Sequence, residues 1–178
     1  EQDEPLVLGQ DALDIGVAAI GLCAFSPLLL LTAVAVWVKM GRPILFRQQR
    51  PGRNGRPFVM LKFRTMAVPR TQVDLHKTDT ERLTPLGGIL RRTSLDELPQ
   101  LWNVLRGDMS LVGPRPLLMS YLPYYTKREH LRHAVRPGIT GWAQVHGRNL
   151  ASWDERLADD VSYVETWSLL LDLRIFAL

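Results

Sequence analysis

The pattern of hydrophobic positions changes sharply along this chain. From Ile15 to Val38 there is no charged residue, only an apolar run interrupted by Gly, Ser, Thr and Pro. A helix of about 24 residues is roughly 36 Å long, which is enough to cross the hydrocarbon core of a bilayer. The pattern therefore predicts a membrane-associated helix near the N-terminus.

A proline divides this predicted helix. Ser26-Pro27 lies at its middle, where the proline removes one backbone hydrogen bond and its ring collides with the carbonyl of Cys23. The Ser26 hydroxyl is placed to satisfy part of that loss. Two arrangements remain open: a kinked helix that spans the membrane, or a broken helix that enters and returns on the same side. Hydropathy alone favours the span, with acidic residues 1–14 outside and the following basic residues inside.

After the apolar run the hydrophobic period changes to that of strands. Residues 44–50 and 57–66 flank Pro-Gly and Asn-Gly turn pairs, which predicts a β-hairpin. Alternation in the second strand puts Lys62 and Arg64 on one face. Two cations projecting together either hold one phosphate group or are simply solvated.

Near the C-terminus the period becomes helical. Apolar residues recur at three- and four-residue spacing over residues 152–173 and predict one amphipathic helix. Its stripe is suited to core or membrane-interface packing. The residues of this stripe are Trp153, Leu157, Val161, Val164, Trp167 and Leu171.

Charge is distributed as unevenly as hydrophobicity. Every charged residue before Lys39 is acidic, whereas residues 39–70 carry Lys and Arg and no acid. Basic charge beside an apolar segment is typical of the cytoplasmic side and attracts anionic lipid. A nucleic-acid-binding face is the alternative, but no motif of that kind is present, so we expect no nucleic-acid partner. The single cysteine, Cys23, excludes an intrachain disulfide.

Two adjacent carboxylates, Asp96 and Glu97, stand among arginines. One interpretation is structural: Ser94 and Glu97 fit a capping box, and acids in a first helical turn complement the helix dipole. The other is chemical. Both carboxylates can reach one cation beyond the helix end, and an excess of arginine indicates a bound polyanion whose charge is shared with Mg²⁺. Nearby cations would favour an ionised carboxylate, as a nucleophile attacking phosphorus requires. The chemistry predicted is phosphoryl transfer.

Other chemistries fit the sequence poorly. It contains neither the G-x-x-x-x-G-K-[ST] phosphate loop nor a G-x-G-x-x-G fingerprint. His130 and His133 lack the further ligands that a zinc site needs.

Long motifs in a fixed order resemble those of the monotopic phosphoglycosyl transferases, bacterial enzymes that begin glycan assembly on a polyprenol carrier. After the apolar segment with Ser26-Pro27, the chain reads FRQQRPGRNGRPF (46–58), LKFRTM (61–66), LRRTSLDELPQLWNVLRGDMSLVGPRP (90–116) and VRPGITGWAQVHGRN (135–149). The likeness extends over nearly the whole chain. His146 departs from it, since members often carry Asn there.

The resemblance implies roles for individual residues. Asp96 is the expected nucleophile, which takes a phosphosugar from a UDP-sugar and releases UMP. Polyprenyl phosphate, undecaprenyl phosphate in bacteria, then attacks the aspartyl intermediate. Glu97 is the expected catalytic partner, which either helps to place Mg²⁺ with Asp96 or handles the proton of the acceptor phosphate. The basic positions implied to bind phosphate or nucleotide are Lys62, Arg91, Arg115, Arg136 and Arg148.

The resemblance also implies an architecture. We expect a helix-rich α+β fold, in which residues 1–40 form a short lead and a re-entrant membrane helix broken at Ser26-Pro27. Residues 41–178 are expected to form a compact catalytic domain with a small β-hairpin and amphipathic interface helices. It would lie at the cytoplasmic face of the bacterial inner membrane. The short connection from Lys39 to Pro43 is typical of compact members.

Two competing hypotheses remain. One is a single-step transferase that acts on a ternary complex. The other is a membrane-anchored basic scaffold that binds acidic lipid or a protein partner. For the transferase, the expected partners are the sugar donor, the polyprenyl acceptor, membrane lipid and possible downstream glycosyltransferases of a glycoprotein, O-antigen, capsule or exopolysaccharide pathway.

Overall fold

Two helices at the N-terminus meet at a sharp bend. In the computed structural model, which describes residues 4–69, 78–146 and 152–178, α1 spans Glu4–Ala24 and α2 spans Ser26–Met40. The bend between them is 63°. The Ser26 hydroxyl donates a hydrogen bond to the Cys23 carbonyl at 2.8 Å, which confirms that serine replaces the bond lost at Pro27. Among the described helices none is long and apolar enough alone to cross a membrane, whereas this bent pair passes that test together.

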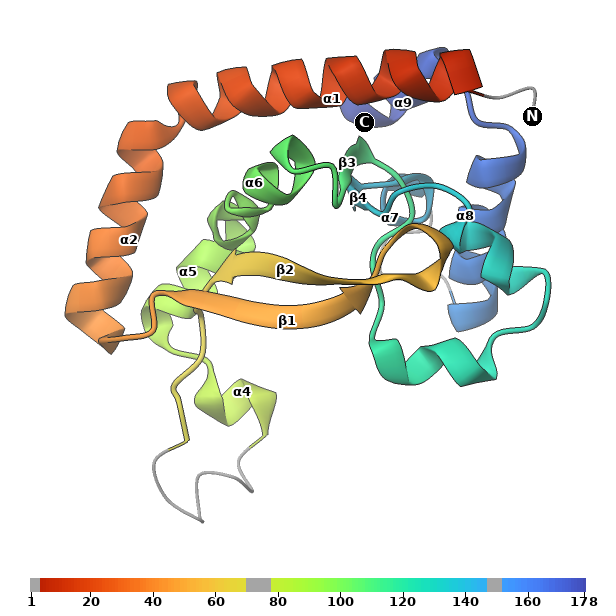
Figure 1. The fold of residues 1–178 in the computed structure, drawn as a ribbon. Coiled ribbons are helices and arrows are strands. Elements are labelled where there is room, and N and C mark those ends of the chain that lie inside the picture. The colour runs from red at the N-terminus through yellow and green to blue at the C-terminus, as the bar shows by residue number, and fades with distance from the viewer. Residues whose placement is uncertain (1–3, 70–77, 147–151) are drawn as a thin grey trace.

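The bent pair lies along two sides of the remaining chain (Figure 1). Ala18 of α1 and Val36 of α2 are fully buried, each in a separate hydrophobic cluster of the core. Ile20, Leu31 and Val38 are 70%, 67% and 68% exposed. One face of the apolar run therefore packs on the protein and the other is left without a protein partner in the described structure.

The predicted β-hairpin is present. Strands β1 (Leu45–Pro51) and β2 (Pro57–Phe63) pair antiparallel, with Leu45 opposite Phe63. Between them Asn54 and Gly55 have φ angles of 57° and 71° in the 3-10 turn η1 (Arg53–Gly55). This left-handed geometry is the reason that Asn-Gly is favoured there.

The strand ends earlier than predicted, and this changes the role of Arg64. Its guanidinium donates to the carbonyls of Met40 and Gly41 at 2.5 and 2.7 Å, at the C-terminal end of α2. Neither of the two alternatives for Lys62 and Arg64, a shared phosphate or solvation, describes Arg64 fully, since its guanidinium binds the carbonyls at the end of α2.

The carboxylate pair does not begin a capped helix. After α4 (Asp79–Arg82) and α5 (Pro85–Arg92), Asp96 and Glu97 lie in the 3-10 turn η2 (Leu95–Glu97), and α6 starts at Gln100 and ends at Leu105. Ser94 has a φ of 56° and makes no capping hydrogen bond. The predicted capping box is wrong, because the Glu97 carboxylate binds cations from other segments instead.

A second sheet, which the sequence did not indicate, pairs β3 (Ser110–Val112) in parallel with β4 (Gly138–Thr140). The connection between the two strands contains the 3-10 helices η3 (Met119–Tyr124) and η4 (Glu129–His133), and α7 (Trp142–His146) follows β4. These small sheets and many helices confirm the helix-rich α+β class.

The predicted helix over residues 152–173 is two helices, α8 (Trp153–Glu165) and α9 (Leu169–Ala177). The Ser168 hydroxyl accepts from the backbone N–H of Leu171 and caps α9. The Trp167 indole donates to Asp172 at 3.2 Å. These two contacts stabilise the break, and α9 lies beside α1 in Figure 1.

Adjacent glycines in α5 offer a matched test of this packing. A Cβ on Gly87 would lie 1.9 Å from the Thr65 carbonyl oxygen, whereas a Cβ on Gly88 would meet nothing within 4 Å. We expect Gly87→Ala to lower the free energy of unfolding by about 2–4 kcal/mol, because backbone must move. Gly88→Ala removes a flexible residue from a helix and should raise it by about 0.5–1 kcal/mol. Chemical unfolding in detergent measures both, and equal stabilities would contradict the close approach of α5 to Thr65.

Candidate active site

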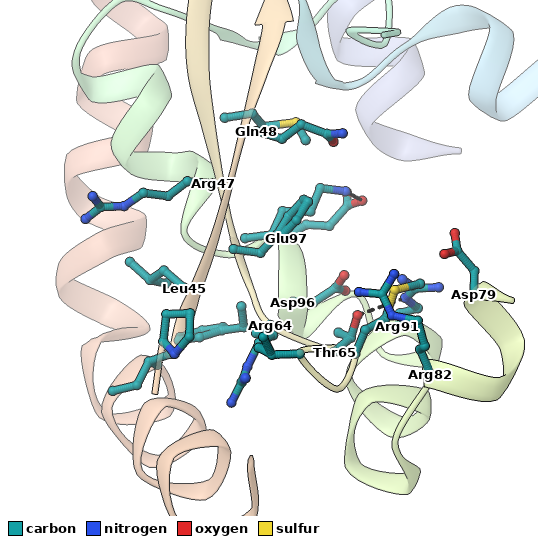
Figure 2. Close-up of a pocket in the computed structure, with 18 of the residues that line it drawn as sticks. Leu45, Arg47, Gln48, Arg64, Thr65, Asp79, Arg82, Arg91, Asp96 and Glu97 are labelled. Atoms are coloured by element: carbon teal, nitrogen blue, oxygen red, sulfur yellow. Dashed lines mark hydrogen bonds and ion pairs between the residues drawn. The ribbon is translucent and has the colours of Figure 1, made fainter. Parts of the chain in front are cut away.

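A large cavity opens between the hairpin and the segment that carries the two carboxylates. Its volume is about 1790 Å³. In Figure 2 Gln48 of β1 lies at the top of the view, with Glu97 below it and Asp96 and Arg91 lower still. The acids that line the cavity are Asp79, Asp96 and Glu97, and the basic residues are Arg42, Arg47, Arg50, Lys62, Arg64, Arg82, Arg91 and Arg115. Such an excess of cations favours a polyanionic ligand.

The structure brings five of the seven predicted site residues to this cavity. They come from three parts of the sequence: Lys62 from β2, Arg91, Asp96 and Glu97 from α5 and η2, and Arg115 from the loop after β3.

The other two predicted basic residues are not among them. Arg136 does not line the cavity and instead pairs with Asp11 of α1, and Arg148 lies outside the described residues.

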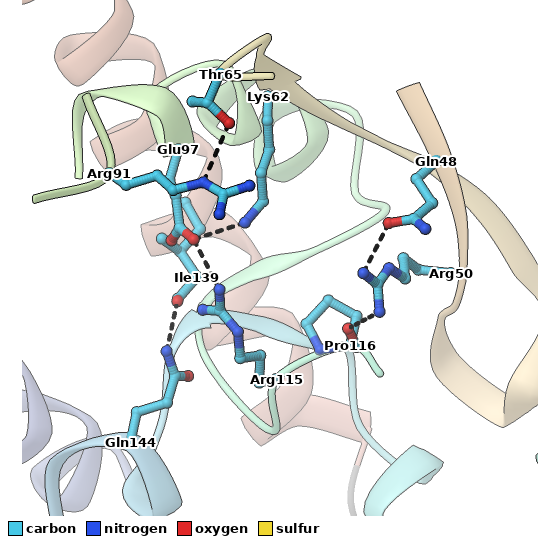
Figure 3. Close-up of polar contacts among 10 residues, drawn as sticks. All are labelled: Gln48, Arg50, Lys62, Thr65, Arg91, Glu97, Arg115, Pro116, Ile139 and Gln144. Carbon is cyan, nitrogen blue, oxygen red and sulfur yellow. Dashed lines mark hydrogen bonds and ion pairs between the residues drawn. The ribbon is translucent and has the colours of Figure 1, made fainter. Parts of the chain in front are cut away.

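Glu97 holds two of the cations. Its Oε1 accepts from Lys62 Nζ at 2.6 Å and from Arg115 Nη2 at 2.7 Å (Figure 3). Burial alone would raise the pKa of Glu97, but Arg115 and Lys62 outweigh it and hold that pKa below its ordinary value. Glu97 is therefore an ionised clamp that fixes the positions of Lys62 and Arg115.

Asp96 has the opposite environment. Its side chain is buried, and burial raises the pKa of its carboxyl above the ordinary value, although Lys62 and Arg91 act to lower it. The expectation that neighbouring cations keep Asp96 more readily ionised is thus wrong for the ligand-free site, because desolvation dominates. Within the described part of the chain, no side chain donates a hydrogen bond to this carboxylate. Its oxygens remain available to a ligand.

Arg91 comes from the last turn of α5. Its Nε donates to Thr65 Oγ1 at 3.1 Å, just after β2 (Figures 2 and 3). This bond uses one of the five guanidinium N–H groups and orients the rest beside Asp96.

Several polar residues of the cavity were not predicted, among them Arg50 and Gln144. Arg50 donates to Gln48 Oε1 at 2.7 Å and to the Pro116 carbonyl at 3.2 Å, and its buried Nε has no partner among the described atoms. Strand alternation was the available signal, since it places Gln48 and Arg50 on one face. Gln144 donates to the Ile139 carbonyl at 3.3 Å, and nothing in its local sequence indicated the cavity.

The donor set can be compared with the needs of Mg²⁺. Across the described residues no group of three or more His, Cys, Asp or Glu side chains forms a metal cage. Mg²⁺ is commonly held by one or two carboxylates together with substrate phosphates. The carboxylate of Asp96 accepts no hydrogen bond from a described side chain and fits that requirement, whereas Glu97 Oε1 is already occupied by two cations. The site therefore suits a Mg²⁺ ion that arrives with a phosphate ligand.

Known proteins resemble this chain over most of its length. Residues 7–178 match the family described as "Bacterial sugar transferase". The "Uncharacterized sugar transferase EpsL" of Bacillus subtilis (strain 168) is 52% identical over 165 residues, covering 93% of this chain and 82% of the relative.

Relatives named for their reaction are also similar. The "UDP-glucose:undecaprenyl-phosphate glucose-1-phosphate transferase" of Caulobacter vibrioides is 46% identical over 178 residues. The match covers 94% of this chain and 67% of the length of that relative. The protein of the same name in Escherichia coli (strain K12) is 42% identical over 174 residues. The match covers 92% of this chain but 38% of the length of that relative.

Proposed function

The chain belongs to the bacterial sugar transferase family and is a transferase, and from that premise we propose that it moves a phosphosugar from a UDP-sugar to undecaprenyl phosphate. Its relatives' names support the donor and acceptor classes. The proposed reaction is a first membrane step of bacterial glycan assembly. We further propose two chemical steps through a covalent bond to Asp96.

One observation carries this proposal: a buried carboxylate, to which no side chain of the described residues donates a hydrogen bond, lines a cavity rich in cations. A surface ion pair would have saturated Asp96, as Lys62 and Arg115 saturate Glu97 Oε1. A scaffold that binds acidic lipid needs cations at its surface, but it does not need to bury an unpaired carboxylate, which costs free energy. A nucleophile needs both accessible oxygens and a ligand whose charge is neutralised nearby.

In the first step an Asp96 oxygen attacks the β-phosphorus of the UDP-sugar. A new O–P bond forms as the bond between that phosphorus and the bridging oxygen breaks, and the bridging oxygen leaves on UMP with the electron pair. In the second step an oxygen of undecaprenyl phosphate attacks the same phosphorus. Asp96 then leaves as a carboxylate, so it neither gains nor loses a proton over the cycle.

Cations surrounding the nucleophile supply the remaining stabilisation. Lys62 and Arg115, fixed by Glu97, and Arg91, fixed by Thr65, are placed to neutralise the phosphates. Mg²⁺ bound by Asp96 and the second Glu97 oxygen would supply further neutralisation of the diphosphate. If Asp96 alone holds the ion, the second Glu97 oxygen accepts the proton of the acceptor phosphate instead.

We propose that α1 and α2 form a re-entrant membrane segment, so that the cavity lies at the cytoplasmic face of the inner membrane. The cavity lining begins at Arg42, directly after α2 ends at Met40. An acceptor phosphate held at the level of lipid headgroups would thus reach the cavity beside the end of α2. Outward-facing Leu31 and Val38 are suited to contact acyl chains.

A screen of UDP-sugars for UMP release tests the function. We expect the purified protein, with Mg²⁺ and undecaprenyl phosphate, to release UMP from at least one UDP-sugar and to form a lipid-linked product. EDTA should abolish the release. If no UDP-sugar is consumed although the protein is folded and binds anionic vesicles, the scaffold hypothesis replaces the transferase.

A further inference from the structure

The loop that carries Arg115 is held by an unusual set of contacts. Three successive carbonyls each accept a hydrogen bond from a different segment. Gly138 N–H donates to Pro114 at 3.0 Å, Arg132 Nη2 to Arg115 at 2.8 Å, and Arg50 Nη1 to Pro116 at 3.2 Å. Because both prolines lack an N–H group, carbonyl contacts carry most of the main-chain positioning.

The donor to the Arg115 carbonyl is almost completely buried. Arg132 is 3% exposed and its partner Asp160 on α8 is 5% exposed. Nε and Nη2 of Arg132 contact Asp160 Oδ2 at 3.1 and 2.6 Å, and Nη1 donates to the Tyr125 hydroxyl at 3.3 Å. These contacts fix the guanidinium on more than one side.

Burying this ion pair is costly, since desolvation offsets much of the attraction between the two charges. A buried pair is therefore weak evidence of a purely stabilising role. Arg132 does not line the cavity, so direct contact with a ligand there does not account for it either. What its geometry does provide is a rigid donor aimed at the main chain of one cavity residue.

From these contacts we propose that Arg132, held by Asp160, is a positioning residue that fixes the main chain of Arg115 so that the Arg115 guanidinium reaches Glu97 and the substrate phosphates. This inference rests on the proposed function for its effect on turnover. The connection runs from Asp160 through Arg132 to the Arg115 carbonyl, and from the Arg115 side chain to Glu97. Figure 3 shows the last of these contacts and the neighbouring bond from Arg50 to Pro116.

Arg132→Lys separates positioning from charge. Lysine keeps a cation for Asp160, but its single ammonium cannot reproduce the planar set of donors that also reaches Arg115 and Tyr125. The matched control is Arg128→Lys. Arg128 precedes η4 and pairs with Glu165 of the same helix α8 at 3.4 Å, but the pair is exposed and, among the described residues, forms no hydrogen bond or ion pair with Arg115.

We expect Arg132→Lys to lower kcat/KM for the UDP-sugar about tenfold, since a displacement near 1 Å costs up to about a hundredfold. Arg128→Lys should stay within about twofold of the unmodified protein. The decisive readout is a double-mutant cycle. If Arg132 acts through Arg115, then adding Arg132→Lys to Arg115→Ala should lower kcat/KM by less than about a further twofold. If the loss of kcat/KM in the double variant equals the product of the two single losses, the proposal is overturned.

A second readout needs no activity. Nitrogen-15 NMR of the arginine side chains should show the Arg115 guanidinium signal shifted in Arg132→Lys and unchanged in Arg128→Lys, because Arg115 then loses its fixed contact with Glu97. An unchanged Arg115 signal in Arg132→Lys would refute the positioning role even if the protein were inactive on every UDP-sugar. Inactivity of the unmodified protein would instead refute the proposed function.

Discussion

Asp96→Asn is expected to lower turnover at least about a thousandfold while leaving the protein folded. The amide has nearly the volume of the carboxyl group but is not a nucleophile toward phosphorus. UMP release with undecaprenyl phosphate measures the loss. A variant that kept normal turnover would exclude Asp96 as the nucleophile.

The same substitution is expected to leave stability unchanged or to raise it at neutral pH. Asp96 is buried, no described side chain donates to its carboxylate, and its pKa is raised by burial. A raised carboxyl pKa means that the ionised form is disfavoured in the folded protein, so replacing it removes an unfavourable buried charge.

Asp108→Asn is the control for Asp96→Asn. Asp108 lies on the loop after α6 and pairs with exposed Arg106 at 3.5 Å. Its replacement should keep turnover within about twofold, because the residue does not line the cavity. A thousandfold loss confined to Asp96→Asn, with no loss of stability, would be the signature of a reacting group.

Glu97→Gln is expected to lower kcat/KM about a hundredfold and also to destabilise the fold. The neutral amide leaves Lys62 and Arg115 without the charge that draws them together, and truncating one partner of such a partly buried group costs about 1–3 kcal/mol. Activity and chemical unfolding measure the two effects. Glu165→Gln, which removes the same charge from an exposed pair with Arg128, should change neither.

The pH dependence of that stability difference has a definite sign. The pKa of Glu97 is lowered in the folded protein, so its contribution is complete above the ordinary value of 4.5 and is lost as the pH falls through the folded value. The difference in unfolding free energy between the unmodified protein and Glu97→Gln should therefore shrink on acidification below about 4.5. A difference that grew with acid would contradict the clamp.

Features set by local sequence were predicted well. The helix break at Ser26-Pro27 follows from the chemistry of one proline and one hydroxyl, and the hairpin follows from its Asn-Gly turn and flanking strands. Both depend on neighbours within a few residues, which sequence patterns record directly.

Features set by distant contacts were predicted poorly. Glu97 fitted a helix cap in one of its two interpretations, but Lys62 and Arg115 bind it instead. Arg136 was expected in the site, but α1 packs close enough for Asp11 to pair with it. Local propensity cannot register such competition, because the competing partner lies far away in the chain.

The candidate site shows the same division. The long motifs pointed to Lys62, Arg91, Asp96, Glu97 and Arg115, and all five line one cavity. Arg132 stands in the stretch His130-Leu131-Arg132-His133. Nothing in that stretch indicated that Arg132 is buried against Asp160. Its proposed role became visible only when the carbonyl of Arg115 was accounted for.

Trapping of the intermediate is the most direct test of the covalent step. The protein is incubated with Mg²⁺ and an accepted UDP-sugar without undecaprenyl phosphate, quenched, and measured by intact mass and peptide mapping. The account predicts one equivalent of UMP released, a mass increase of one phosphosugar on the peptide that contains Asp96, and no adduct in Asp96→Asn. Release of UMP only after acceptor is added, with no adduct on any residue, would show transfer in a single step and contradict it.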